Sequence, residues 1–160
     1  MRQLLWKLSA GAAGLAMAAT TVNGAIDGPV PIPDRAKGAD RVVVATVTDA
    51  HARYELNQWG DRIIVTHAGL AVEEALKGTG EPAMLAVEGG TVAGVTLHVS
   101  SLPLIAPGNR GVFFLKHGAN GEFTPHLRGQ GILALDRSNH VRGSALSLDD
   151  VRRMVRGQAR

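Results

Sequence analysis

The sequence predicts a single all-β domain whose last segment is a helix. Short runs rich in valine, leucine and isoleucine alternate with turns, which are supplied by 20 glycines and seven prolines. Hydrophobic residues make up 45% of the chain but aromatic residues only 4%, so the core must be aliphatic. A chain of 160 residues is long enough for one domain of ordinary size and too short for two.

Residues 1–25 have the layout of a secretory signal peptide. Arg2 and Lys7 precede an apolar run over 8–22, and the small residues Gly24 and Ala25 follow it. The alternative is a membrane anchor, but this run is shorter than the roughly 20 residues that a spanning helix needs. We expect cleavage near Gly24 or Ala25 and a secreted or periplasmic protein, which contacts the membrane only through this leader.

Residues 26–40 are predicted to be an extended lead-in. Pro29, Pro31 and Pro33 alternate with apolar residues there, and proline cannot donate a hydrogen bond to a sheet. This segment is either a docking arm or a terminus that lies along the surface of the domain.

Residues 41–146 are predicted to form the β domain. The expected strands are 41–48, 62–72, 83–87, 95–100, one within 106–118, 123–126 and 131–136. Of these, the stretch 106–118 is the most apolar, since Val112 to Leu115 lie between the turn-forming Pro107-Gly108-Asn109 and Gly118. The strand at 62–72 is followed by Glu73 to Gly78, whose composition leaves a turn of helix open.

Three further patterns in this region concern turns and strand faces. Gly89-Gly90 predicts a hairpin, and Gly129 with Gly131 indicates a bulge or a close approach of two backbones. Strict alternation over 95–100 predicts that Val95, Leu97 and Val99 face inward and that His98 faces outward.

Residues 147–160 are predicted to be an amphipathic helix. Ser147 is a suitable N-cap, Asp149 and Asp150 suit its positive end, and arginines follow. The apolar stripe that should dock on the sheet consists of Leu148, Val151, Met154 and Val155.

The charge balance argues against nucleic-acid binding. Of the 17 basic residues, Arg2 and Lys7 belong to the leader, which leaves 15 against 14 acidic residues. Binding of single-stranded nucleic acid requires aromatic residues interleaved with basic ones on exposed β-strands, and this sequence does not show that pattern. Only the C-terminal end is basic; it either meets an acidic partner or anionic surface, or is an ordinary solvated helix face.

No motif for catalysis or metal binding is present. The chain has no cysteine, and its six histidines do not have the spacing of a metal motif, so a metal site would have to be assembled across strands. No serine lies in a G-x-S-x-G elbow and no phosphate-binding loop is found. The adjacent carboxylates Glu73-Glu74 and Asp149-Asp150 fit solvated faces and helix capping better than acid–base pairs. We therefore assign no catalytic, cofactor-binding or metal residues, and the sequence gives an enzyme no support.

Four residues are predicted to form an interaction surface: Tyr54, Trp59, His98 and Arg110. Tyr54 and Trp59 lie in a polar connector after the first strand, where flat amphipathic rings suit stacking on a ligand. The alternative is that both rings are lids over the end of the core.

Residues 41–136 resemble a group of small exported bacterial proteins, mostly uncharacterised. The matching segments are 44–48, 72–78, Gly89-Gly90, 99–103, 107–110 with 112–115, and 129–131. Members of this group often accompany matrixin-like metalloproteases. The strand order is also similar to the five-stranded OB-type barrel of netrin-like domains in tissue inhibitors of metalloproteases. Those inhibitors place an N-terminal cysteine on the catalytic zinc, so the absence of cysteine here excludes that route and no active residues can be transferred.

The resemblance implies a small OB-like barrel of five or six strands with a C-terminal helix. It also implies a non-catalytic binding or accessory module that acts on another exported protein, for example a protease, without a cofactor. The alternatives are a secreted hydrolase whose site is assembled only in three dimensions, and a structural component of the envelope.

Overall fold

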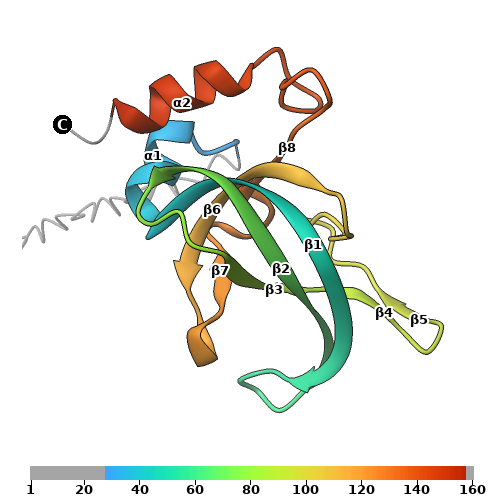
Figure 1. The fold of residues 1–160 in the computed structure, drawn as a ribbon. Coiled ribbons are helices and arrows are strands. Elements are labelled where there is room, and N and C mark those ends of the chain that lie inside the picture. The colour runs from blue at the N-terminus through green and yellow to red at the C-terminus, as the bar shows by residue number, and fades with distance from the viewer. Residues whose placement is uncertain (1–27, 158–160) are drawn as a thin grey trace, which may run out of the picture.

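The structure is a computed structural model, and it describes residues 28–157 (Figure 1). The predicted signal peptide and its cleavage site lie outside the described residues, as do residues 158–160. The helices are α1 (Ile32–Gly38) and α2 (Leu148–Arg156), with 3-10 turns η1 (Ala119–Gly121) and η2 (Arg128–Gly131). The strands are β1 (Arg41–Leu56), β2 (Arg62–Lys77), β3 (Ala83–Glu88), β4 (Gly90–Val92), β5 (Val95–Leu97), β6 (Arg110–His117), β7 (Phe123–Pro125) and β8 (Ile132–Ala134).

Five of these strands form a nearly closed ring. The main sheet has the order β1-β2-β3-β7-β6-β8, and β1 also pairs with β6, so that β1, β2, β3, β7 and β6 follow one another around the ring. The weakest link is between β3 and β7, which run parallel and share one residue pair, Leu85 with Phe123. The predicted β-rich, cysteine-free architecture with a C-terminal helix is therefore confirmed.

The ring is buried on both faces where β1 meets β6. Val43 and Phe113 point into the ring, whereas Val42 and Phe114, their neighbours in sequence, point to the opposite face and meet the helices. A strand that is buried on both faces needs a continuous apolar run, which is what residues 112–115 supply. Figure 1 shows α1 and α2 together over one end of the sheet.

The C-terminal helix matches the prediction closely. Ser147 accepts a hydrogen bond from the backbone N–H of Asp150, and the Asp150 side chain accepts one from the backbone of Ser147, which forms a capping box. Leu148, Val151 and Val155 are buried against the sheet, and Met154 is partly buried beside them.

The prediction of an extended lead-in over 26–40 is wrong for residues 32–38, which form α1. Pro33 lies in the first turn of this helix, where its missing N–H removes no hydrogen bond. The helix is stabilised by burial of Ile32 and Ala36, and the Lys77 amino group donates to the carbonyl oxygens of Ala36 and Ala39 at its C-terminal end.

The first two strands are longer than predicted. Residues 49–56 continue β1 instead of forming a polar connector, and Glu73 to Lys77 continue β2 instead of turning into helix. In both segments cross-strand pairing overrides local composition, because Tyr54 lies opposite Ile64 and Glu74 lies opposite Val44. Only residues 57–61 form the turn between them.

The predicted hairpin at Gly89-Gly90 is wrong. These glycines take the chain out of β3 with φ of 110° and 127°, and the hairpin turn follows at Ala93-Gly94, between β4 and β5. This two-stranded hairpin projects from the ring (Figure 1), so Val95 is 55% exposed rather than facing the core. Leu97 and Val99 are partly buried.

The last predicted strands are shorter than expected, with β7 ending at Pro125 and β8 at Ala134. The predicted close approach of backbones is found: a Cβ atom on Gly129 would overlap the carbonyl oxygen of Ser101.

Candidate functional site

The four predicted site residues do not form one surface. Arg110 on β6 lies opposite Thr46 of β1, whereas Tyr54 lies eight residues further along the same strand. At about 3.3 Å per residue this places them some 26 Å apart along the strand. His98 is exposed just after β5. The structure therefore leaves two separate regions, one around Trp59 and one around Arg110.

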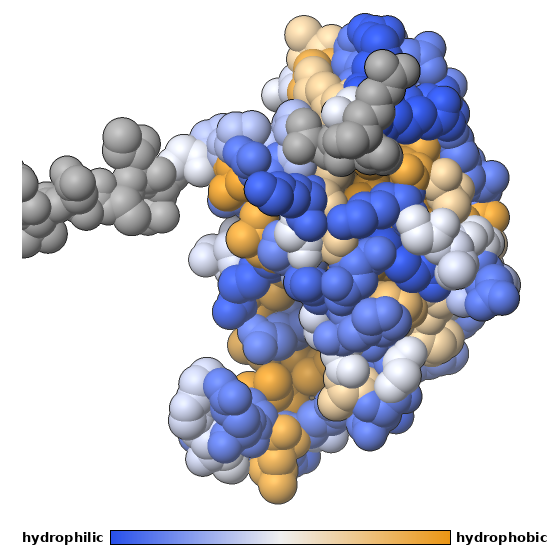
Figure 2. All heavy atoms as spheres, turned by 90° about the vertical axis from the view of Figure 1, so that its left-hand side faces the viewer, coloured by the Kyte–Doolittle hydropathy of each residue, from blue (hydrophilic) through white to orange (hydrophobic). Residues whose placement is uncertain are grey.

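The first region, which we call the hairpin tip, consists of Tyr54, Leu56 and Trp59 at the far end of β1 and β2. Leu56 is 73% exposed and Trp59 is 76% exposed, so the tryptophan does not serve as a lid over the core. The Tyr54 ring is half-buried, with the Arg62 guanidinium 3.8 Å from its centre. Figure 2 shows hydrophobic residues at the lower end of the molecule, which is the end that carries this turn in Figure 1.

The turn that carries Trp59 is ordered by Asn57. The Oδ1 atom of Asn57 accepts hydrogen bonds from the backbone N–H of Trp59 at 2.9 Å and of Asp61 at 2.8 Å. Its Nδ2 atom donates to the Asp61 carboxylate at 3.1 Å. An Asx-type turn of this kind fixes the backbone locally, so the exposed ring is held on a defined support.

The hairpin tip adjoins an open sheet edge. The pairing of β1 with β6 ends at Thr46, and Val47 still exchanges backbone hydrogen bonds with Gly108 and Asn109; further along, β1 pairs with β2. The carbonyl oxygen of Ile64 on β2 accepts a hydrogen bond from the backbone N–H of Gly89, so it points away from β1. Tyr54 lies opposite Ile64, and in an antiparallel pair its backbone N–H and C=O then point away from β2, toward the outer edge of β1. An edge of this kind can pair with an added strand.

A buried histidine lies between two carboxylates near the base of the hairpin. The Nδ1 atom of His67 is 2.8 Å from Glu122 Oε1, and its Nε2 atom is 2.8 Å from Glu55 Oε1. Glu55 also accepts a hydrogen bond from Arg53, and this bond, followed by the one from His67, lowers the pKa of Glu55. Both ring nitrogens are therefore already engaged by side chains of the protein. Within residues 28–157 no three histidine or acidic side chains are arranged to hold a metal ion.

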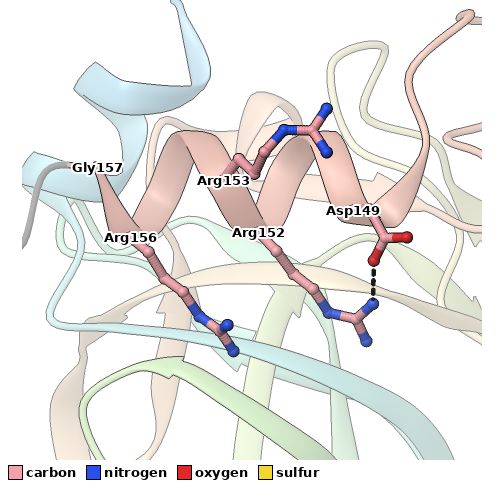
Figure 3. Close-up of a pocket in the computed structure, with 5 residues that line it drawn as sticks. All are labelled: Asp149, Arg152, Arg153, Arg156 and Gly157. Atoms are coloured by element: carbon pink, nitrogen blue, oxygen red, sulfur yellow. Dashed lines mark hydrogen bonds and ion pairs between the residues drawn. The ribbon is translucent and has the colours of Figure 1, made fainter.

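The basic residues of α2 are neutralised by Glu74 of β2 and by acidic residues of α2 itself. Glu74 binds Arg152 at 2.6 Å and Arg156 at 2.8 Å, and Arg153 pairs with Asp150. Figure 3 shows the shallow cavity beside these arginines, where Arg152 is bonded to Asp149. Strongly hydrophilic residues cover this end in Figure 2. The expected basic surface is thus a network of ion pairs, which disfavours a free anion site there.

The adjacent carboxylates Glu73 and Glu74 both serve this network. The Arg110 guanidinium binds Glu73 through Nε at 3.0 and 2.9 Å, and this hydrogen bonding lowers the pKa of Glu73 and raises that of Arg110. Arg110 also donates to the side chain of Asn139 at 2.7 Å. Its role is therefore to connect β6, β2 and the turn before α2.

The second region contains a small apolar pocket beside Arg110. It lies between β6, β8 and the 103–105 segment, and its volume is about 170 Å³. Its apolar lining includes Leu104, Ile105, Phe113, Ile132 and Ala134. Sequence patterns did not indicate this pocket, because it depends on β8 pairing with β6 across a loop.

The chain matches no known family model, and no curated protein matches it. Neither helix within residues 28–157 is long and apolar enough to cross a membrane.

Proposed function

We propose that the protein is an exported, non-catalytic binding module that docks on another exported protein through the hairpin tip, a protease being one such partner. The observation that carries this proposal is the exposure of Leu56 and Trp59, at 73% and 76%, on an ordered turn. Tryptophan is enriched among the residues that dominate binding energy at protein interfaces. The open edge of β1 beside Tyr54 supplies backbone partners at the same place.

An OB-like classification of the ring is part of this proposal. The order β1-β2-β3-β7-β6 with a return pairing to β1, and the parallel contact of β3 with β7, support it. In OB folds ligands bind on the face of strands 2 and 3 and on the loops that flank it. The loop between the first two strands is the one that carries Trp59 in this chain.

The alternative of a hydrolase gains no support from His67. Both nitrogens of this ring lie 2.8 Å from carboxylate oxygens and its side chain is 9% exposed, so neither nitrogen is placed to contact a substrate.

The test is recovery of a partner from the exported fraction of the source cells. The mature chain, immobilised on a support, should retain one protein in stoichiometric amount, which mass spectrometry identifies and which is then purified for affinity measurement. The double variant Leu56→Ser and Trp59→Ser should bind that protein about tenfold or more weakly while keeping the wild-type circular dichroism spectrum.

The matched control is Met84→Ser, which removes another exposed apolar side chain, 44% exposed, from β3. It should bind the partner as the wild type does. Repeated recovery of no exported protein would count against the binding function, and equal binding by the double variant would remove the hairpin tip from it.

A further inference from the structure

The pocket between β6, β8 and the 103–105 segment is a hollow that the strand register creates. Ala45, Gly111 and Ala134 lie side by side across β1, β6 and β8, and all three are small. The next row on the same face carries Val43, Phe113 and Ile132. Of the small row, Ala134 lines the pocket beside Phe113 and Ile132 of the large row, and the 103–105 segment closes the space from the side.

The rim of this pocket carries hydrogen-bond donors that have no partner among residues 28–157. Arg142 lines the pocket, and within residues 28–157 its guanidinium makes no hydrogen bond or ion pair. Asn109 also lines it; Oδ1 accepts from the backbone N–H of Ala106, whereas Nδ2 donates to none of the described residues.

The other charged groups near the rim are already bound. Arg110 is held by Glu73 and Asn139. Asp136 is close enough for Arg142 to contribute to its lowered pKa, but its Oδ1 atom accepts from the backbone N–H of Ser138 and His140, both at 2.8 Å. Among the described residues at this rim, Arg142 is consequently the cation whose guanidinium can meet a ligand.

From this geometry we propose that the pocket binds a small carboxylate that bears a short apolar chain. The chain lies against Phe113 and Ile132, and the carboxylate accepts hydrogen bonds from the Arg142 guanidinium and Asn109 Nδ2. A volume of about 170 Å³ corresponds to roughly six water volumes of about 30 Å³ each, so a chain of about five carbons fills it.

Two sources carry this chemistry: a free short-chain acid, and the C-terminal residue of a polypeptide that ends in leucine or a similar side chain. The proposal is independent of the hairpin tip, since Arg110 at the pocket lies opposite Thr46, whereas Trp59 lies beyond the end of β1 at Leu56. Loss of partner binding at the hairpin tip would leave carboxylate binding in the pocket unaffected.

The experiment is a titration of the ¹⁵N-labelled mature protein, followed by chemical shifts in proton–nitrogen NMR spectra. Hexanoate should cause saturable shifts confined to 103–113 and 132–142, with a dissociation constant in the millimolar range or below. Hexanamide, which lacks the charge, and acetate, which lacks the chain, should bind at least about tenfold more weakly. The peptide acetyl-Gly-Leu with a free C-terminus, compared with its amide, tests the polypeptide source.

Two variants and one control complete the test. Arg142→Met should weaken hexanoate binding about tenfold, and Ala134→Leu, at an exposed position, should abolish it by filling the hollow. Arg137→Met removes an exposed arginine outside the pocket and should have no effect. Binding of acetyl-Gly-Leu in place of hexanoate would support the site and name the polypeptide source. Absence of binding by both, or unchanged binding in Arg142→Met, would overturn the proposal.

Discussion

His67 is a buried residue whose side chain contacts two carboxylates from different parts of the chain. Its side chain is 9% exposed, and it separates two carboxylates that are 33% and 22% exposed. Replacement by leucine removes the hydrogen-bond partner that Glu55 and Glu122 share, so His67→Leu should lower the free energy of unfolding by about 2 kcal/mol. Urea denaturation followed by circular dichroism measures this change.

The matched control is His51→Leu. His51 lies directly opposite His67 on β1, but its side chain is 85% exposed. Its replacement should change the free energy of unfolding by less than about 0.5 kcal/mol. If both variants unfold at the same urea concentration as the wild type, His67 does not have the stabilising role that its two contacts indicate.

The His67 cluster also shows what a single sequence cannot reveal. Histidine and glutamate are 12 residues apart in one pair and 55 in the other, and neither separation matches a motif on one element. His67 on β2 and Glu122, just before β7, come together because β2, β3 and β7 lie side by side in the sheet. That strand order depends on pairing between segments far apart in the sequence. The exposure of His98 follows from the alternation over 95–100, whereas the sequence left Trp59 open between a stacking surface and a lid over the core.

At the level of elements, η2 is held in place by a backbone contact that only glycine permits. A Cβ atom on Gly129 would overlap the carbonyl oxygen of Ser101, so Gly129→Ala must displace the segment that follows it. We expect a loss of about 2 kcal/mol in the free energy of unfolding, together with NMR shift changes over 101–105.

Gly80→Ala serves as the control for this prediction. The nearest atom to a Cβ at Gly80 is the Ala75 side chain at 3.8 Å, which is an ordinary contact. This variant should be within about 0.5 kcal/mol of the wild type. Equal stability of the two variants would mean that the 101–105 segment can move without cost.

Elements with strong local signals could be predicted, and elements stabilised by partners could not. The C-terminal helix has its cap, its charges and its apolar stripe within ten residues, and β6 has a continuous apolar run. In contrast, residues 49–56 look polar because one face of that half of β1 is solvated and carries His51 and Arg53. Their strand conformation comes from pairing with β2, which local composition does not encode.

For the whole molecule, the ion pairs and turns predict loss of stability in acid. Five carboxylates have lowered pKa values, each chiefly because it accepts one hydrogen bond. The donor is the backbone N–H of His117 for Asp40, the side chain of Arg53 for Glu55, the side chain of Arg110 for Glu73, the backbone N–H of His140 for Asp136, and the hydroxyl of Ser147 for Asp150. Each carboxylate is charged more readily in the folded protein, so its charged form stabilises the fold. This stabilisation is complete above the ordinary pKa of 3.8 for aspartate or 4.5 for glutamate, and it is lost as the pH falls through the lowered pKa.

His126 should add an earlier step to this decline. Burial, followed by repulsion from Lys116, lowers its pKa below the ordinary 6.5, and its ring packs against Gly38 at the end of α1. The folded state therefore resists protonation of this ring, and the stability that it contributes above pH 6.5 is lost as the pH falls below that value. Urea midpoints from pH 7.5 to 3 should fall in two stages, and His126→Gln should remove the upper one. His98→Gln, at an exposed ring, should retain both stages; a constant midpoint between pH 7 and 5 in the wild type would contradict the assignment to His126.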